Sequence, residues 1–366
     1  MDRKHAVNED CLKLTSYFGE RHRVGGRFFA DAIMDVYGRH EVATSIMLRG
    51  TAGFGLKHHL RTDQSLTLSE DLPVTTIAVD TRSRIEGLLG EVDGLNPNGL
   101  MVLERARMLQ HEVGPAVLPQ QLHEGTKLTI YVGRQERVFR MPAYQAVCRL
   151  LHRRGIAGAT VLLGVDGTAH GDRQRARFFG RNADVPMMIM TVGDGDRIAR
   201  VLPELGGLLE HPLLTLERVR ICKRDGQLFE RPHALPESDE RGLQLWQKLM
   251  VYTSESALHE GKPIHRALVQ RLRRSGTARG ATVLRGMWGF HGAHRPHGDR
   301  LFQLSRHVPT LTTVIDRPGN IAASFDIVDE LTREHGLVTT EMVPALTATD
   351  AHGNRRGGTT LADHEF

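Results

Sequence analysis

Apolar residues follow two patterns along the chain, and each pattern predicts one kind of secondary structure. Short runs rich in valine, isoleucine and leucine are typical of buried strands, whereas apolar residues at helical spacing are typical of amphipathic helices. The clearest helical pattern occurs three times, each time after a short apolar run. Its apolar positions are Ile85, Leu88, Leu89, Val92 and Leu95, then Ile198, Val201, Leu202, Leu205 and Leu208, and then Ile321, Phe325 and Val328. The pattern predicts that one unit of strands and helices is repeated along the chain.

Four short sequences return in the same order and at nearly constant spacing, which is the signature of an internal repeat. The first carries a lysine in an apolar run: LKLTSYFGE at 12–20, TKLTIYVGR at 126–134 and QKLMVYTSE at 247–255. The second ends in glycine: ATSIMLRG at 43–50, GATVLLG at 158–164 and GATVLRG at 280–286. The third and fourth are DLPVTTIAVD at 71–80, DVPMMIMTVGD at 184–194 and HVPTLTTVID at 307–316, and GLMVLERARM at 99–108, PLLTLERVRI at 212–221 and GLVTTEMVPA at 336–345. We therefore predict three copies of one domain.

Within each copy the patterns predict strand, helix, strand, strand, helix and strand, which is the split βαβ or ferredoxin-like arrangement. Both helices then cover one face of a four-stranded antiparallel sheet. The first strands are apolar or bulky on both sides, as in LTIYV at 128–132, so the open faces are expected to pack against one another. The fold class is thus α+β, with three tandem ferredoxin-like domains.

Proline, glycine and polar residues mark the joints between the copies. We predict repeat 1 at 9–109, repeat 2 at 124–222 and repeat 3 at 244–346, with linkers at 110–123 and 223–243 and a disordered, glycine-rich tail at 347–366.

Composition narrows the setting and the partners. The net charge of +5 is spread among 43 acidic residues and aromatic residues make up only 5%, so a nucleic-acid partner is not expected. The three cysteines form no CxxC pair, which argues against a disulfide framework or a zinc knuckle. No apolar run has the length of a membrane span and the first residues lack the apolar core of a signal peptide, so we expect a soluble, cytoplasmic protein.

Each copy resembles the PII-like proteins of the DUF190 family, whose function is unknown. In copy 1 the resemblance rests on KLTSYFGE at 13–20, RGTAGFG at 49–55, LSEDLPV at 68–74 and GLMVLERARM at 99–108. It spans nearly all of copies 1 and 3, whereas copy 2 has LLGVDGTAHGD in place of the Gly-Phe-Gly sequence. PII signalling proteins are ferredoxin-like homotrimers that bind adenine nucleotides in the clefts between subunits. The resemblance therefore implies a monomeric, single-chain pseudo-trimer.

The resemblance also implies a ligand site at the glycine-rich strand exits, where backbone N–H groups could approach a small anionic ligand. No cofactor is certain, and an adenine nucleotide is the candidate. The alternative is that these glycines only help the chain to turn, and no glycine- and lysine-rich second phosphate loop is present. The candidate ligand-binding residues are Arg49, Gly50, Gly53, Phe54 and Gly55 in copy 1 and Arg285, Gly286, Gly289, Phe290 and Gly292 in copy 3.

Long loops follow these exits. The resemblance implies that these loops contact a regulatory protein partner, for which a membrane transporter or channel is a candidate. The loop of copy 2 carries Arg173, Arg175, Arg177 and Arg181, which could meet an acidic partner or remain solvated. The loop of copy 3 carries His291, His294 and His297, an unlikely metal site because glycine and proline interrupt the spacing.

No catalytic motif such as GxSxG, GxxxxGK[ST] or HExxH occurs in the chain. A non-enzymatic regulatory protein is therefore the leading hypothesis. A divalent-metal-binding or purely structural protein is the main alternative, and an enzyme with a site between repeats is a weaker one. Copy 2, without Gly-Phe-Gly, is expected to be a degenerate or scaffold copy.

Overall fold

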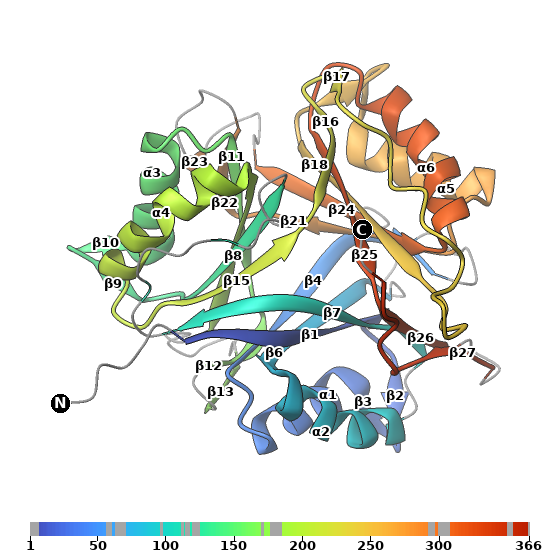
Figure 1. Ribbon diagram of the computed structural model, residues 1–366, viewed down its shortest axis with the longest axis horizontal. Helices are drawn as coiled ribbons and strands as arrows, with labels where there is room; N and C mark the ends of the chain where they lie inside the picture. Colours follow the sequence, from blue (N-terminus) through green and yellow to red (C-terminus); the bar gives the residue numbers. More distant parts are fainter. Residues whose placement is uncertain are drawn as a thin grey trace.

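The computed structural model consists of three similar units arranged around a common centre (Figure 1). It describes residues 7–55, 61–62, 71–95, 98–110, 113, 118, 125–169, 172–175, 185–291, 297–298, 308–349 and 354–364. Each unit contains two helices and an antiparallel sheet, and the three sheets join through hydrogen-bonded strands into one larger sheet.

Repeat 1 contains the predicted order of strand, helix, strand, strand, helix and strand. Its main elements are β1 (Val7–Gly19), α1 (Phe29–Arg39), β4 (Thr44–Phe54), β6 (Pro73–Thr81), α2 (Arg82–Gly94) and β7 (Gly99–Gln110). The sheet order is β4–β6–β1–β7, with every pair antiparallel. Short strands β2 (Arg23–Val24) and β3 (Arg27–Phe28) form a hairpin before α1, and β5 (Arg61–Thr62) pairs with β4.

Repeats 2 and 3 have the same order of elements and the same sheet order. Repeat 2 has β8 (Thr126–Gly133), β9 (Arg137–Val138), β10 (Met141–Pro142), α3 (Ala143–Arg153), β11 (Gly158–Leu163), β12 (Asp166–Ala169), β13 (Asp172–Arg175), β14 (Pro186–Gly193), α4 (Gly195–Leu208), β15 (Leu213–Arg218), β16 (Arg220–Arg224) and β17 (Gln227–Leu228). Repeat 3 has β18 (Trp246–Ser254), β19 (Leu258–His259), β20 (Lys262–Pro263), α5 (Ile264–Ser275), β21 (Ala281–Arg285), β22 (Trp288–His291), β23 (His297–Gly298), β24 (Pro309–Asp316), α6 (Pro318–Leu331), β25 (Leu337–Val343), β26 (Ala345–Thr349) and β27 (Arg355–Gly358).

The helices of each repeat cover the outward face of its sheet, and the opposite sheet faces turn toward the centre (Figure 1). Alternation along β1 explains this division, because Leu12, Leu14 and Phe18 pack in the helical core whereas Cys11 faces the other way. The central core contains buried residues from all three repeats, including Met108, Met190 and Leu311. The expectation that the open sheet faces pack against one another is confirmed.

Two sets of strand exchanges join the repeats in a closed cycle. The extended second strand of repeat 1 pairs with β21 of repeat 3, β22 of repeat 3 pairs with β11 of repeat 2, and β12 of repeat 2 pairs with β4 of repeat 1. The last strands form the second set: β7 pairs with β15, β16 pairs with β25, and β26 pairs with β7. Each pair of repeats therefore shares two strand junctions, and no repeat is at an end.

The prediction of a disordered tail at 347–366 is wrong for the residues that the structure describes there. β27 pairs with β26, so this segment satisfies its backbone hydrogen bonds in a hairpin. Leu361 is buried in the core of repeat 1, and the backbone N–H of Ala362 donates to Pro344 O at 2.8 Å. The high glycine content concealed this hairpin, in which Gly357 adopts a φ of 72°.

None of the described helices is both long and apolar enough to cross a bilayer. All three cysteines are buried and form no disulfide.

Candidate functional site

The glycine-rich strand exits are the crossings between repeats. A Cβ atom at Gly53 would lie 2.6 Å from Ala281 O, one at Gly289 would lie 2.3 Å from Ala159 O, and one at Gly167 would lie 2.4 Å from Ser45 O. Each of these oxygens belongs to the neighbouring repeat. The glycines are required because two backbones approach each other more closely than a side chain permits.

A second glycine, three residues earlier, packs against the proline that begins the third strand. Cβ atoms at Gly50 and Gly286 would lie 2.7 Å from Pro73 Cγ and 2.8 Å from Pro309 Cγ. In repeat 2 a Cβ atom at Gly164 would lie 2.6 Å from Pro186 O. The shared sequence is thus Gly-x-x-Gly, and repeat 2 retains it although it lacks Gly-Phe-Gly.

The residue after the second glycine is a phenylalanine in repeats 1 and 3 and a threonine in repeat 2. Phe54 and Phe290 are both 4% exposed, and each enters the core of the neighbouring repeat opposite an alanine. The corresponding residue of repeat 2, Thr168, lies opposite Ser45, and their hydroxyl oxygens are 2.9 Å apart. This junction therefore has a hydrogen-bonded polar pair where the other two have a large apolar residue facing a small one.

The two arginines of the exits form equivalent ion pairs in repeats 1 and 3. Arg49 donates to Glu20 at 2.8 Å, and Arg285 Nε donates to Glu255 at 3.0 Å. Each carboxylate follows the first strand of the same repeat. These contacts engage both guanidinium groups with a residue of their own repeat.

A cavity of about 390 Å³ lies between repeats 1 and 3, where the crossing strand β4 ends. Phe54 and Gly55 form part of its wall, so the structure places these two predicted residues at a cleft between repeats. Repeat 1 also contributes Tyr17 and Phe18, and repeat 3 contributes Trp246 and Ile315. The strands β26 and β27 close one side of the cavity. We call it the 1/3 cleft.

Charged groups line the 1/3 cleft among these apolar residues. They are Arg21, Asp71, Arg279, Asp316 and Arg356. Asp316 accepts a hydrogen bond from the backbone N–H of Arg279 at 3.0 Å, and Asp71 accepts one from the N–H of Arg21 at 2.7 Å. These three arginines and two aspartates together carry one net positive charge.

His22 also lines the 1/3 cleft and adds little charge at neutral pH. Burial lowers the pKa of its imidazole, and nearby Asp71 only partly offsets this effect. The ring packs edge-on against Phe29 with 5.3 Å between the ring centroids. The cleft therefore becomes more positive only when the pH falls below the usual range of histidine.

Sequence reasoning missed most of the residues that form this cleft. Arg356 lies in the segment expected to be disordered. Trp246 lies two residues before the repeated lysine of its first strand, and the residues at this position in the other repeats are Cys11 and Gly125. The signal in the sequence that could have pointed to the cleft is Trp246, a tryptophan at a position where the other two repeats have small residues.

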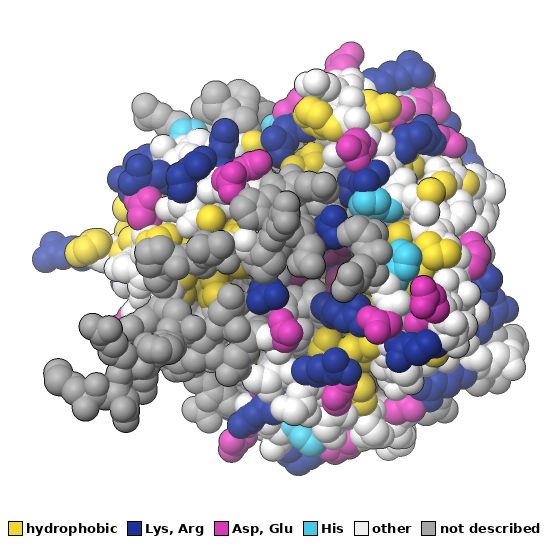
Figure 2. Space-filling view, viewed as in Figure 1, with side chains coloured by type: hydrophobic (Ala, Val, Ile, Leu, Met, Phe, Trp, Pro, Cys, Tyr) yellow, Lys and Arg dark blue, Asp and Glu magenta, His cyan; other side chains and the backbone are white. Residues whose placement is uncertain are grey.

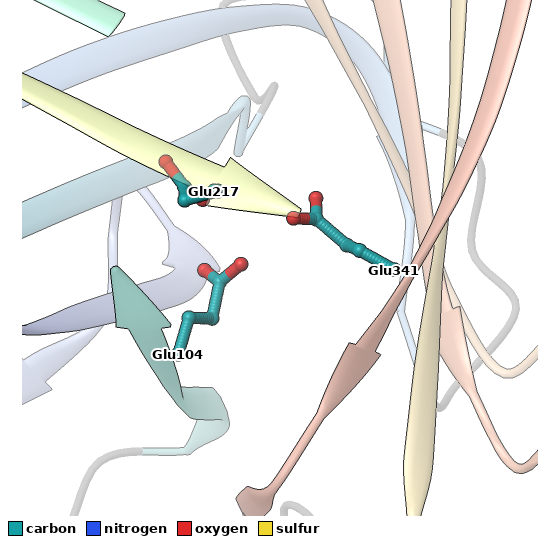
Figure 3. A group of neighbouring side chains, drawn as sticks. All are labelled: Glu104, Glu217 and Glu341. Carbon is teal, nitrogen blue, oxygen red and sulfur yellow. The ribbon is translucent and has the colours of Figure 1, made fainter. Parts of the chain in front are cut away.

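A second unpredicted cluster lies where the three sheets meet. Figure 3 shows Glu104, Glu217 and Glu341 pointing toward one another from three different strands. Their carboxylate oxygens lie within 4.8 Å of one another. The lysines of the three repeated first strands lie among them, and every member is at most 5% exposed. We call these residues the central Lys/Glu cluster: Lys13, Lys127, Lys248, Glu104, Glu217 and Glu341.

Within this cluster the lysines bridge carboxylates of different repeats. Lys127 Nζ lies 2.8 Å from Glu217 and 2.7 Å from Glu341, and Lys13 Nζ lies 2.8 Å from Glu217. Lys248 Nζ contacts Glu104 and lies 2.9 Å from Glu341. Three positive and three negative charges balance, and the ammonium groups already neutralise the carboxylates that a metal ion would need. The described contacts of the cluster are therefore those of a buried ion-pair network.

The charges of the cluster sustain one another against burial. Burial opposes ionisation of Glu104, but the ammonium groups of Lys248, Lys13 and Lys127 outweigh it and hold the pKa of this carboxyl well below its usual range. The pKa of Glu217 is lowered in the same way, against its burial, by Lys127 and Lys13. Burial likewise opposes the charge of Lys248, whereas Glu104 and Glu341 raise its pKa.

The remaining predicted sites are only partly described. Arg173 and Arg175 lie in strand β13, and Arg177 and Arg181 lie outside the described residues. His291 Nε2 lies 2.6 Å from Asp225 Oδ1 of repeat 2, and His297 lies in β23. Gly292 and His294 lie outside the described residues. The described contacts of His291 thus link two repeats and bring no second histidine to it.

Comparison with known proteins agrees with the threefold repetition. The model of the DUF190 family, described as "Uncharacterized ACR", matches residues 11–108, 125–221 and 246–345. A UPF0166 protein of Aquifex aeolicus (strain VF5) is 32% identical over 99 residues, which are 27% of this chain and 90% of that relative. A relative of this kind therefore has the length of one repeat.

Proposed function

The chain belongs to the DUF190 family, and from this premise we propose that it is a non-enzymatic, PII-like regulatory protein that binds a small anionic ligand in the 1/3 cleft. In this proposal each repeat is a ferredoxin-like domain, and the chain is the monomeric, single-chain counterpart of a trimer. The cyclic strand exchange supports this reading, because each repeat pairs with both of the others.

The observation that carries the proposal is the 1/3 cleft itself. A cavity of about 390 Å³ is within the usual size of small-molecule sites, which are mostly apolar with a few polar groups. Three arginines line it, from β27, from the residues just before β21, where Arg279 also lies 3.8 Å from Asp316, and from the segment after β1. Guanidinium groups suit phosphate and carboxylate ligands because they donate planar pairs of hydrogen bonds.

Regulation would follow from the position of the cleft between two repeats. A ligand that contacts both repeats favours the arrangement in which the cleft is formed, and it can shift the conformational population only by that differential affinity. The cleft lies where β4 leaves the sheet toward its long loop. Binding would in this way change the affinity of the loops for a partner protein, for which a membrane transporter or channel remains a candidate.

The chain offers a direct reporter for this site. It contains two tryptophans, of which Trp246 lines the 1/3 cleft whereas Trp288 packs against Tyr144 at the junction of repeats 2 and 3. In a Trp288→Phe variant, titration with ATP, ADP, cyclic AMP or inorganic phosphate should change the fluorescence of Trp246. A Trp246→Phe variant, which retains Trp288, should show no change.

Substitution of a cleft arginine tests the contact more closely. Arg356→Ala should weaken binding of the anion about tenfold or more, because a hydrogen bond to a charged group contributes about 1.5–3 kcal/mol. Arg355→Ala is the matched control, since Arg355 in the same strand instead pairs with Asp93 at 2.5 Å. The proposal fails if none of these anions changes the fluorescence of Trp246 or raises the melting temperature.

A divalent-metal-binding protein remains the alternative suggested by the histidine-bearing loop. In the described part of the chain, the grouped carboxylates are already paired with lysines, and this does not support it. A rise in melting temperature with zinc or copper, and with no anion, would favour this alternative.

A further inference from the structure

The hairpin β9–β10 of repeat 2 carries the most exposed large apolar side chain in the described chain. Phe139, at its tip, is 95% exposed, whereas the other exposed large apolar residues are at most 53% exposed. The hairpin projects from the edge of the molecule (Figure 1), and hydrophobic and basic side chains extend beyond the surface there (Figure 2). A single exposed phenylalanine is common on protein surfaces, so the backbone and the charges around it decide what this one indicates.

The backbone at this tip is unfavourable for the residues that occupy it. Phe139 has a φ of 47° and Arg140 a φ of 71°, so two successive residues with side chains adopt the left-handed region. That region is disfavoured for bulky residues, and a two-residue hairpin turn of this kind normally selects Asn-Gly. The corresponding tips carry Gly25-Gly26 in repeat 1 and Glu260-Gly261 in repeat 3. Repeat 2 therefore retains an aromatic and a basic residue where glycine would be more stable.

The charges around Phe139 have one sign. Arg134, Arg137 and Arg140 are all exposed. The one acidic residue of the hairpin, Glu136, turns inward and accepts a hydrogen bond from the N–H of Gly133 at 3.0 Å. Burial raises the pKa of this carboxyl, and the hydrogen bond from Gly133 opposes that shift.

The hairpin of repeat 1 has similar residues but uses them within the repeat. Arg27 pairs with Asp35 at 2.5 Å, and the guanidinium of Arg23 lies 4.0 Å from the centroid of the Phe28 ring. Phe28 is only 39% exposed. Both hairpins contain a hydrogen bond from a guanidinium to the backbone, Arg23 to Gly26 O at 2.9 Å and Arg137 to Arg140 O at 3.0 Å. The two hairpins differ in the aromatic ring, which is far more exposed in repeat 2 than in repeat 1.

We propose that the β9–β10 hairpin of repeat 2 inserts Phe139 into the interfacial region of an anionic lipid bilayer. An aromatic side chain at the apex and arginines set back along both strands match the two layers of such a surface, apolar beneath and negatively charged above. A specific protein partner would instead need on the order of 1,000 Å² of total contact, which a convex two-residue tip does not provide by itself.

Three arginines and one phenylalanine are too few groups to hold the protein on a membrane irreversibly. Each basic residue near an anionic membrane strengthens binding about fivefold, since its contribution is about 1 kcal/mol. Three arginines and one aromatic ring are comparable to a single lipid anchor, which gives only marginal, reversible attachment. The hairpin would therefore concentrate the protein at a membrane without fixing it there, and salt would weaken the attachment.

Sedimentation of the full chain with vesicles tests this inference. The chain should bind vesicles of mixed phosphatidylcholine and phosphatidylglycerol more strongly than vesicles of phosphatidylcholine alone. The double substitution Phe139→Asn with Arg140→Gly should weaken this binding more than tenfold and should raise the melting temperature, because Asn-Gly fits the turn. Arg137→Gln should weaken it about fivefold.

A matched control separates this hairpin from the basic surface in general. Phe28→Ala, in the equivalent hairpin of repeat 1, should leave vesicle binding unchanged. The inference is overturned if the chain does not sediment with the anionic vesicles, or if the double variant is folded and binds them as well as the native chain does. Equal binding to both kinds of vesicle would also overturn it.

Discussion

The centre of the molecule and its edge treat the three repeats differently. At the centre each repeat supplies one lysine from its first strand and one glutamate from its last strand, and the six side chains form one cluster. At the edge the equivalent hairpin tips are Gly25-Gly26, Phe139-Arg140 and Glu260-Gly261. Equivalent positions are thus uniform in the central Lys/Glu cluster and divergent at the hairpin tips.

This difference explains what a single chain gains over three identical subunits. A symmetric trimer must change all three copies of a position at once, whereas three fused repeats can change one. Two junctions have a phenylalanine facing an alanine, Phe54–Ala281 and Phe290–Ala159, whereas the third has Thr168 facing Ser45. The 1/3 cleft is likewise described between one pair of repeats, and the exposed Phe139 tip belongs to one repeat.

The largest effect is expected from removing one charge at the centre. Glu217→Gln leaves Lys13 without its 2.8 Å partner and Lys127 with only Glu341. Breaking a buried ion pair in this way costs about 3–5 kcal/mol, because an uncompensated charge stays buried. Urea denaturation of the two proteins measures the difference.

A surface pair provides the matched control for this substitution. Glu204 lies 2.7 Å from Arg154, and both side chains are at least 35% exposed. Glu204→Gln should cost about 0–1 kcal/mol. A cost for Glu217→Gln as small as that of the control would show that the central cluster does not hold the repeats together.

The same cluster should set the acid limit of stability. Burial opposes the ionised forms of Glu104 and Glu217, but neighbouring ammonium groups hold both pKa values below that of an unfolded glutamate, about 4.3. Their contribution is therefore complete above about pH 4.3 and is lost as the pH falls through the folded-state values. Urea midpoints measured between about pH 7 and about pH 3 should fall more steeply for the native chain than for Glu217→Gln. Parallel curves for the two proteins would contradict this assignment.

A smaller effect is expected at the strand crossings, and it should be the same in all three repeats. Gly53→Ala, Gly167→Ala and Gly289→Ala each place a methyl group 2.3–2.6 Å from a backbone oxygen, so each should cost about 1–3 kcal/mol. Gly87→Ala, in helix α2 with open space around it, should instead stabilise by about 0.5–1 kcal/mol. Thermal unfolding would distinguish the cases, and a tolerated Gly167→Ala would mean that repeat 2 does not cross as the others do.

The smallest effect concerns the polar contact at the third junction. Thr168→Val and Ser45→Ala each remove one hydroxyl of the 2.9 Å pair. Their combined effect should be about 0.5–1.5 kcal/mol less than the sum of the single effects, because the double variant leaves less of the pair unsatisfied. Strict additivity in this double-mutant cycle would show that the two hydroxyls do not interact.

The repeated sequences predicted the order of elements within each unit because burial imposes clear periods on strands and helices. The packing of the open sheet faces was also predicted, since strands such as β8 are apolar or bulky on both sides. The strand exchanges could not be predicted, because a glycine that serves a close approach looks the same in sequence as one that serves a turn. Gly53 and Gly167 are such glycines.

The candidate site was harder to predict than the fold. Arg49 and Arg285 were predicted as ligand contacts, and the structure adds that each pairs with a glutamate of its own repeat. Arg356 and Trp246 come from distant parts of the chain and meet only because repeat 3 packs against repeat 1. The lysine of each first strand marked the repeats in sequence, yet its glutamate partners could be identified only once the three sheets were placed together.

The mass of the protein in solution tests the central claim, that the three repeats close on one another within a single chain. If the strand exchanges are intramolecular, light scattering should give the mass of one chain, 40.8 kDa, at every concentration measured. A stable mass of three chains would contradict the account, because the repeats would then exchange strands between chains.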